Sequence, residues 1–209
     1  GTDGAGSVRI PAAFCGNVGF KPSFGRVPAY PLSPFGSVAH LGSHTMSVVD
    51  AALMMNVMSL PDARDWTSLP YVPIDYLSNL QAGVKGLRIA YSLTLGYAQV
   101  DVEVAAAVQL AVESLADMGA QVEECDLGFS DPLDIITGLW FAGAWQIWST
   151  LTEKQQALTD PDFRAQAELG SRLSVSDMHQ LNQRRGQLGS HMRQFMQRYD
   201  LIVTPTVAV

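Results

Sequence analysis

The chain has 209 residues, of which 47% are hydrophobic and 16% are charged. This length suits about one domain, and this composition excludes a disordered or collagen-like segment. The net charge of −7, from 13 basic and 20 acidic residues, argues against a general affinity for nucleic acid or for anionic lipid.

Residues 1–45 are rich in helix breakers, with eight of the 18 glycines and five of the 11 prolines. They predict loops and short strands, which often carry functional residues. From Ser47 to about Ser59 apolar residues recur at helical intervals, with Ser47 or Asp50 at the N-terminus and Pro61 beyond the end. The predicted face of this helix comprises Val48, Ala51, Leu53, Met54, Val57 and Met58. A polar connection that contains proline follows the helix.

The middle of the chain predicts a βαβ unit. Residues 87–91 form a short apolar run that indicates a buried strand. A helix is predicted from residue 101 or 102 to Gly119, where glycine favours a stop. Its apolar face comprises Val104, Val108, Ala111, Val112 and Leu115. Residues 120–125 alternate as a second strand, and this order implies parallel strands in an α/β fold.

Residues 131–153 hold a group of aromatic side chains on a predicted helix. These residues are Trp140, Phe141, Trp145 and Trp148. Positions 141, 145 and 148 share one helical face, and two interpretations stay open. The helix either packs into the core or forms the wall of an apolar pocket. Under the second interpretation, the candidate substrate-pocket residues are Trp140, Phe141 and Trp145.

The last part of the chain predicts a polar helical stretch over residues 162–200 and a strand over residues 199–203. No internal repeat or interdomain linker is evident. The chain opens at Gly1 without methionine and stops soon after the last strand. Both ends look like interruptions, so we expect the middle of a longer protein.

The two cysteines, Cys15 and Cys125, lie far apart and lack the spacing of a zinc site. Their predicted state is a buried free thiol, and no metal or cofactor is predicted. No apolar run reaches the roughly eighteen residues that cross a bilayer, and no segment resembles a signal peptide. The expected compartment is the cytoplasm.

The segment from Gly1 to Arg9 carries the clearest chemical signal. Three glycines and one alanine precede Ser7, so backbone N–H groups can approach a ligand almost unobstructed. Such a run can form a nest for an anion or for a developing oxyanion. The letters match neither a Walker loop nor a dinucleotide loop, which argues against phosphate binding.

Ser7 is a candidate nucleophile without a local base. A serine hydroxyl is a poor nucleophile until a base removes its proton. There is no GxSxG elbow, and Ile10 stands where an SxxK motif needs lysine. Surface roles are predicted for the four histidines, which are His40, His44, His179 and His191. Residue types and spacing therefore leave the base unidentified.

Residues 1–16 read GTDGAGSVRIPAAFCG, and residues 18–28 read VGFKPSFGRVP. These letters closely resemble the core of the amidase signature family, whose pattern is roughly GTDx[GA]GS[IV]RxP[AS] followed by GxxG[LF]KP[ST]. A weaker likeness extends to residues 47–53, 85–90 and 199–206. The resemblance implies an α/β fold with a mixed sheet wrapped by helices and incomplete at both ends. In that fold, residues 1–209 would form the central part of a single amidase signature domain.

The resemblance also implies a reaction. Family members hydrolyse carboxylic amides through a serine acyl-enzyme, using a serine nucleophile, a second serine held by a cis peptide bond, and a lysine. By motif position the nucleophile is Ser7, while Thr2, Asp3 and Arg9 are supporting residues. Lys21 matches a scaffold position of the pattern rather than the base. The implied oxyanion-hole donors are the N–H groups of Gly4, Ala5, Gly6 and Ser7.

In the family, the lysine and the cis-peptide serine precede the position that matches Gly1. We therefore expect this polypeptide alone to be inactive, and its parent protein to be an amidase for a small-molecule amide, acting without cofactor, nucleic acid or membrane. The oligomeric state stays open, with a homodimer among the options. One rival interpretation is the A subunit of glutamyl-tRNA(Gln) amidotransferase, which usually carries an ExSSNLxR-like segment where this chain has residues 138–145. Another is a non-catalytic relative that keeps the scaffold for binding.

Overall fold

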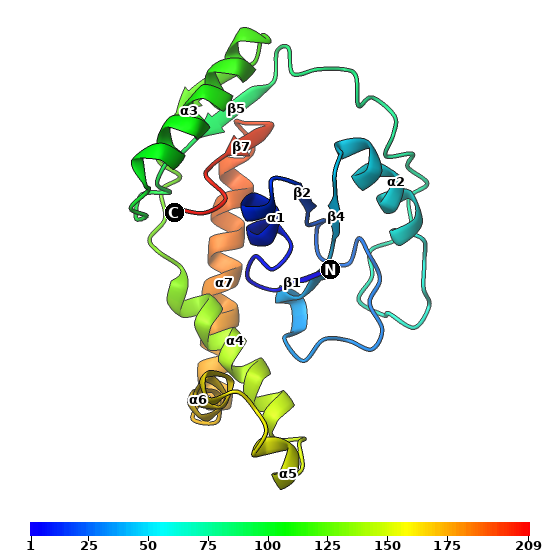
Figure 1. Cartoon of the computed structure of the whole chain (residues 1–209), viewed down its shortest axis with the longest axis vertical. Helices are drawn as coiled ribbons and strands as arrows, with labels where there is room; N and C mark the ends of the chain where they lie inside the picture. Colours follow the sequence, from blue (N-terminus) through cyan, green and yellow to red (C-terminus); the bar gives the residue numbers. More distant parts are fainter. The chain divides into compact units, whose positions relative to one another are not determined.

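The computed structural model describes all 209 residues as helices, short strands and connecting loops (Figure 1). The chain divides into two units, one of residues 1–78 with 133–182 and the other of residues 79–132 with 183–209. The expected mixed α/β class is confirmed, and the strands form three small sheets. None of the helices combines the length and the apolar composition that crossing a bilayer requires.

The strands of the first unit form two antiparallel pairs. Strand β1 (Thr2–Asp3) pairs with β3 (His40–Leu41), and β2 (Val18–Phe20) pairs with β4 (Ser43–Thr45). In the first pair, Asp3 lies opposite His40. This register brings the glycine-rich loop next to a segment almost forty residues further along the chain.

Helix α1 (Arg9–Cys15) lies in a region for which the sequence predicted only loops and strands. The sequence did not predict this helix because Pro11 lies within it. Proline is nevertheless tolerated in a first helical turn, where its missing N–H has no intrahelical partner. The helix ends at Gly16, which adopts the left-handed conformation with φ of 63°. A short 3₁₀ helix, η1 (Gly36–Val38), follows in the same region.

Helix α2 (Val48–Met58) confirms the predicted helix and its cap. The Ser47 hydroxyl oxygen accepts a hydrogen bond from the Asp50 N–H at 3.1 Å. The predicted apolar face was wrong apart from Ala51. The buried residues are Ala51, Ala52 and Met55, and α2 packs on β2 and β4. The larger members of the predicted face are exposed, namely Val48, Leu53, Met54 and Val57.

Residues 59–78 of the first unit form loops and turns, and its remaining part, residues 133–182, is mostly helical. It comprises α4 (Leu133–Trp148), α5 (Glu153–Gln156), α6 (Pro161–Gly170) and the first part of α7 (Val175–Phe195). The predicted helical stretch over residues 162–200 is therefore two helices, separated by residues 171–174. Helices α4 and α6 pack closely against each other. A small core cluster forms around Val38, Ile135 and Leu139.

The second unit contains a parallel sheet in the order β6-β5-β7. Its strands are β5 (Arg88–Tyr91), β6 (Gln121–Glu124) and β7 (Leu201–Val203). Helix α3 (Val102–Asp117) connects β5 to β6, which confirms the predicted βαβ unit. On the predicted face of α3, Val112 is buried while Ala111 is exposed. Arg88 pairs with Asp200 at 2.9 Å and joins β5 to the residue before β7.

Both cysteines are free thiols, as the sequence predicted, but the predicted burial of their side chains was wrong. Cys15 is exposed because α1 buries only Ala12, and Cys125 is half-buried beside the core of the second unit. His191 also differs from its predicted surface role. It is half-buried, and its Nε2 lies 2.6 Å from the Leu127 carbonyl oxygen.

Candidate functional site

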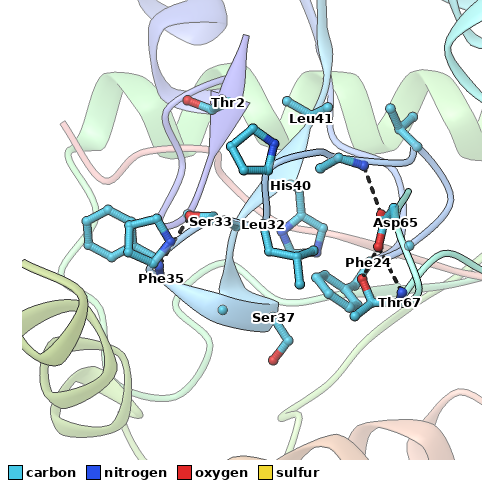
Figure 2. Close-up of a pocket in the computed structure, with 18 of the residues that line it drawn as sticks. Thr2, Phe24, Leu32, Ser33, Phe35, Ser37, His40, Leu41, Asp65 and Thr67 are labelled. Atoms are coloured by element: carbon cyan, nitrogen blue, oxygen red, sulfur yellow. Dashed lines mark hydrogen bonds between the residues drawn. The ribbon is translucent and has the colours of Figure 1, made fainter. Parts of the chain in front are cut away.

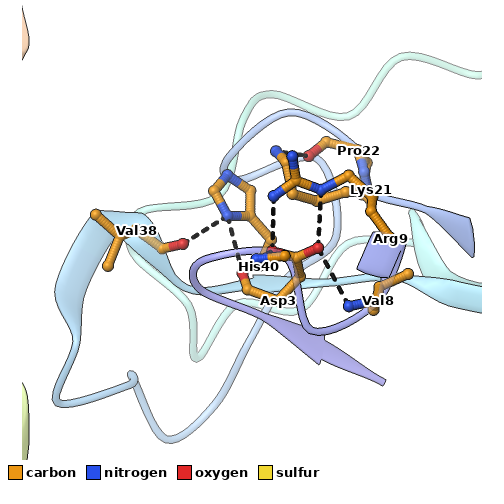
Figure 3. A network of polar contacts seen from close by, with 8 residues as sticks. Asp3, Val8, Arg9, Lys21, Pro22, Val38 and His40 are labelled. Carbon is orange, nitrogen blue, oxygen red and sulfur yellow. Dashed lines mark hydrogen bonds and ion pairs between the residues drawn. The ribbon is translucent and has the colours of Figure 1, made fainter. Parts of the chain in front are cut away.

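The carboxylate of Asp3 holds the glycine-rich loop through hydrogen bonds (Figure 3). Its side chain is fully buried. Asp3 Oδ1 accepts from the Gly6 N–H at 2.7 Å, and Oδ2 accepts from the Val8 N–H at 3.2 Å. The Arg9 guanidinium adds two further contacts, each of 2.9 Å. The loop between Asp3 and Val8 is therefore fixed at both of its ends.

The ionisation of Asp3 follows from these contacts. Burial alone would raise the pKa of Asp3, because desolvation penalises the charged form. The hydrogen bonds from Arg9, Gly6 and Val8, together with the Arg9 charge, outweigh burial and hold the pKa of Asp3 well below its ordinary value of 3.8. Asp3 is therefore an anion at neutral pH and accepts hydrogen bonds without competition from its own proton.

Asp3 also predicts how stability changes in acid. Because its pKa is lowered by folding, its contribution to the free energy of unfolding is full above pH 3.8 and is lost as the pH falls through the folded-state value. The stability difference between the wild type and an Asp3→Asn variant should therefore shrink between pH 5 and pH 3. Urea unfolding at several pH values measures this difference. A gap that stays constant across the range contradicts the assignment.

Ser7 follows this tied loop, is exposed, and lines a cavity. Neither its hydroxyl nor the N–H groups of Gly4, Ala5 and Ser7 has a hydrogen-bond partner in the chain. The expectation of four available donors needs one correction, because the Gly6 N–H is engaged by Asp3. Gly6 also has a φ of +121°, which favours glycine. The loop therefore offers three backbone donors close to one serine.

The cavity has a volume of about 570 Å³ and an apolar wall, which suits a small organic ligand (Figure 2). Phe35 stacks on Trp140 with ring centroids 4.2 Å apart. A Cβ atom added at Gly4 would lie 2.7 Å from Trp140 Cζ3, so the indole directly contacts the glycine loop. Trp140 Nε1 donates to Gln166 Oε1 at 3.0 Å, which fixes the indole ring. The other apolar side chains of the wall include Phe24, Val27, Pro31, Leu32, Pro34, Trp66 and Ile147.

Helix α4 divides its aromatic residues between two faces. Trp140 lines the cavity, together with Ile147 two turns further along. The candidate pocket residues Phe141 and Trp145 do not line it, so their assignment is corrected. The backbone carbonyl of Phe141 and the Cβ atom of Trp145 lie close to Gly170 of α6. Trp140 therefore fits the pocket interpretation, whereas Trp145 fits the interpretation of a helix packed into the core.

His40 lies in the cavity wall, which overturns its predicted surface role. The ring is half-buried and meets Phe24 edge-on at 5.8 Å. Its Nδ1 lies 2.8 Å from the Val38 carbonyl oxygen and 3.3 Å from the Asp3 carbonyl oxygen (Figure 3). Burial and the positive charge of Lys21 lower the pKa of His40 below its usual value. A neutral ring therefore prevails at neutral pH.

Asp65 is a second polar group of the wall and is almost completely buried. Its carboxylate accepts from the Thr67 hydroxyl at 2.6 Å, from the Thr67 N–H at 2.8 Å and from the Ala29 N–H at 2.8 Å (Figure 2). These hydrogen bonds, the Thr67 hydroxyl first, lower the pKa of Asp65. The cavity wall therefore carries one carboxylate that is ionised at neutral pH.

Most of the wall comes from residues 22–41 and 65–67, for which the sequence predicted no site. Only the motif letters around Lys21 to Gly25 hinted at part of it. The remaining wall residues carry no local pattern, because a loop side chain joins a cavity through the fold rather than through its spacing. No group of three or more His, Cys, Asp or Glu side chains is arranged to hold a metal ion.

The chain is thus an α/β protein with an exposed serine on a glycine-rich loop beside an apolar cavity. The Amidase family model matches residues 1–209, and the chain belongs to this family. The chain is 36% identical over 211 residues to an acylamidase of Rhodococcus erythropolis, with all of this chain and 44% of that protein covered. The crystal structure of a bacterial aryl acylamidase of the amidase signature family matches with a TM-score of 0.89 and 30% identity.

The match to that structure covers all of this chain and 45% of the aryl acylamidase. The A subunit of glutamyl-tRNA(Gln) amidotransferase from Staphylococcus aureus is 43% identical over 129 residues, which cover 61% of this chain and 26% of that protein. The chain therefore spans less than half the length of each of these relatives.

Proposed function

We propose that this chain contributes the nucleophile and the oxyanion-binding loop of a serine amidase that hydrolyses a small-molecule amide. One observation carries the proposal: Ser7 lines the cavity with an unpartnered hydroxyl, next to the unpartnered N–H groups of Gly4, Ala5 and Ser7. Fixed backbone donors stabilise a developing oxyanion at low reorganisation cost. The hydrogen bonds that the Gly6 and Val8 N–H groups donate to Asp3 hold the loop in place.

In the proposed reaction, Ser7 Oγ forms a bond to the amide carbonyl carbon as its proton leaves. The carbonyl oxygen becomes an oxyanion held by the loop N–H groups. The C–N bond then breaks, the nitrogen leaves protonated as the amine, and water hydrolyses the ester on Ser7. The family likeness supports a second serine and a lysine as the proton path, both from residues outside these 209. We therefore propose that the 209-residue chain alone does not turn over amides, and that it is the central part of a single catalytic domain.

The amidotransferase A subunit remains a second candidate because its identity to this chain is high over 61% of the residues. The acylamidase match favours a hydrolase instead, because it extends over the whole chain. Glutaminase activity that depends on a partner subunit would reverse this preference. A non-catalytic role is the third candidate, and the labelling experiment below separates it from the enzymes.

The test is covalent labelling of the full-length protein that contains these residues with a fluorophosphonate probe. We expect labelling at Ser7, complete loss of the label in Ser7→Ala, and a decrease of about a thousandfold or more in kcat/KM for amide hydrolysis. The matched control is Ser114→Ala on the exposed face of α3, which should keep both label and activity. Undiminished hydrolysis by Ser7→Ala contradicts the nucleophile. Measurable hydrolysis by the isolated 209-residue chain contradicts its proposed inactivity.

A further inference from the structure

The hydrogen bonds of His40 define its tautomer. Both groups that contact Nδ1, at 2.8 and 3.3 Å, are backbone carbonyl oxygens, of Val38 and Asp3. A carbonyl oxygen can only accept a hydrogen bond, so Nδ1 must carry a proton. The strand pairing that places Asp3 opposite His40 helps to hold the ring in this orientation.

The second ring nitrogen is therefore an acceptor. Burial and the Lys21 charge disfavour the doubly protonated ring by lowering the pKa of His40. In a neutral imidazole with its proton on Nδ1, Nε2 presents a lone pair. No group of the chain donates a hydrogen bond to Nε2. Lys21 Nζ instead donates to the Pro22 carbonyl oxygen at 3.3 Å.

We propose that His40 Nε2 accepts a hydrogen bond from an N–H or O–H group of the ligand in the cavity, and so determines which amides bind there. The proposal rests on the proposed function, in which this cavity is the amide-binding site. The ring lies among the residues that line the cavity (Figure 2), and Ser7 is another of them. His40 is thus a specificity-determining residue that contacts the ligand.

The other residues of the cavity wall indicate which class of ligand the cavity favours. The stacked rings of Phe35 and Trp140 offer an apolar surface for a hydrocarbon or aromatic group. The carboxylate of Asp65 adds negative charge, and no lysine or arginine lines the cavity. A ligand carboxylate would meet Asp65 without a cation beside it, which costs binding free energy. The cavity therefore favours a neutral apolar amide that carries an N–H donor and disfavours a carboxylate.

The first experiment measures Kd for three probes of similar shape by ligand-observed NMR titration, with the full-length protein that contains these residues and carries Ser7→Ala so that no probe is hydrolysed. Benzamide carries an N–H donor, N,N-dimethylbenzamide has none, and benzoate is anionic. One neutral hydrogen bond corresponds to roughly a three- to tenfold change in Kd. We expect benzamide to bind about three- to tenfold more tightly than N,N-dimethylbenzamide, and benzoate to bind most weakly.

Variants of His40 separate the hydrogen bond from the bulk of the two methyl groups. His40→Phe keeps a flat ring but removes the acceptor, so the ratio of the two Kd values should fall about three- to tenfold from its wild-type value. His40→Gln restores an acceptor and should recover part of the ratio. The matched control, His179→Phe on the exposed side of α7, should leave the ratio unchanged. A ratio that is the same in the wild type and in His40→Phe overturns the proposal.

A second measurement needs no variant. In the same full-length protein labelled with ¹⁵N-histidine, the His40 resonances at pH 7 should show a protonated Nδ1 and an unprotonated Nε2. Addition of benzamide should shift the Nε2 resonance, whereas N,N-dimethylbenzamide should leave it almost unchanged. A proton on Nε2 in the free chain, or an Nε2 resonance that benzamide does not move, overturns the proposal. Because neither experiment involves turnover, their outcome is independent of the Ser7→Ala result that tests the proposed function.

Discussion

Replacing Asp3 by alanine should lower the free energy of unfolding by about 2–6 kcal/mol. The change leaves the buried N–H groups of Gly6 and Val8 without acceptors and removes the partner of Arg9. An unsatisfied buried donor costs about 1–3 kcal/mol, and two are created here. Urea unfolding at pH 7, followed by circular dichroism, measures the loss.

The matched control is Asp117→Ala at the exposed end of α3, which should change stability by less than about 0.5 kcal/mol. Arg9→Ala should cost less than Asp3→Ala, because it leaves both backbone donors bonded to the carboxylate. In the full-length protein, Asp3→Ala should also slow labelling of Ser7, since the loop loses its anchor. Equal effects of the Asp3 and Asp117 variants would show that the carboxylate does not hold the loop.

Gly170→Ala should destabilise the chain by about 3 kcal/mol, because it overpacks the contact between α6 and α4. A Cβ atom at Gly170 would overlap the Phe141 carbonyl oxygen and crowd Trp145 Cβ. The nearest atom belongs to the backbone, so a rotamer change cannot relieve the clash. The two helices must separate, and the Trp140 side chain that lines the cavity moves with α4. Urea unfolding gives the loss, and near-ultraviolet circular dichroism reports the tryptophan packing.

Gly186→Ala provides the matched control for this substitution. Gly186 lies within α7 with open space around its Cα, so the added methyl group meets nothing. Alanine is the better helix former by about 0.8–1 kcal/mol, and the variant should be slightly more stable than the wild type. A Gly170→Ala variant as stable as Gly186→Ala would mean that α4 and α6 do not pack as described.

Local signals predicted the elements whose ends are marked in the sequence. The cap at Ser47 predicted the start of α2, and Gly119 predicted the end of the α3 segment. The buried face of α2 could not be predicted in the same way. Large apolar residues mark a core face only when a partner covers them, and of the large apolar residues of α2 only Met55 is buried, beside Ala51 and Ala52.

The candidate site, too, could be predicted only in part from the sequence. Motif letters pointed to Ser7 and its glycine loop, since all these residues are consecutive. They did not reveal that Asp3 uses the Gly6 N–H, because that contact depends on the φ and ψ angles of the loop. His40 and Asp65 could not be found from spacing, as their places in the cavity wall arise from strand register and loop turns.

Because β5 lies in the middle of its sheet, one of its edges stays unpaired during synthesis until β7 has been made. Strand β6 follows β5 after a single helix, but Asp200, which precedes β7, lies 112 residues beyond Arg88. A ribosome that adds about 5–20 residues per second leaves one edge of β5 uncovered for on the order of ten seconds. That edge carries the backbone groups of Arg88 and Ser92, which bond to Asp200 and Val203 in the folded chain, and a nascent chain with an unpaired strand is prone to aggregate or to recruit chaperones. Yields of folded protein should therefore rise when synthesis is carried out at low temperature or with abundant chaperones.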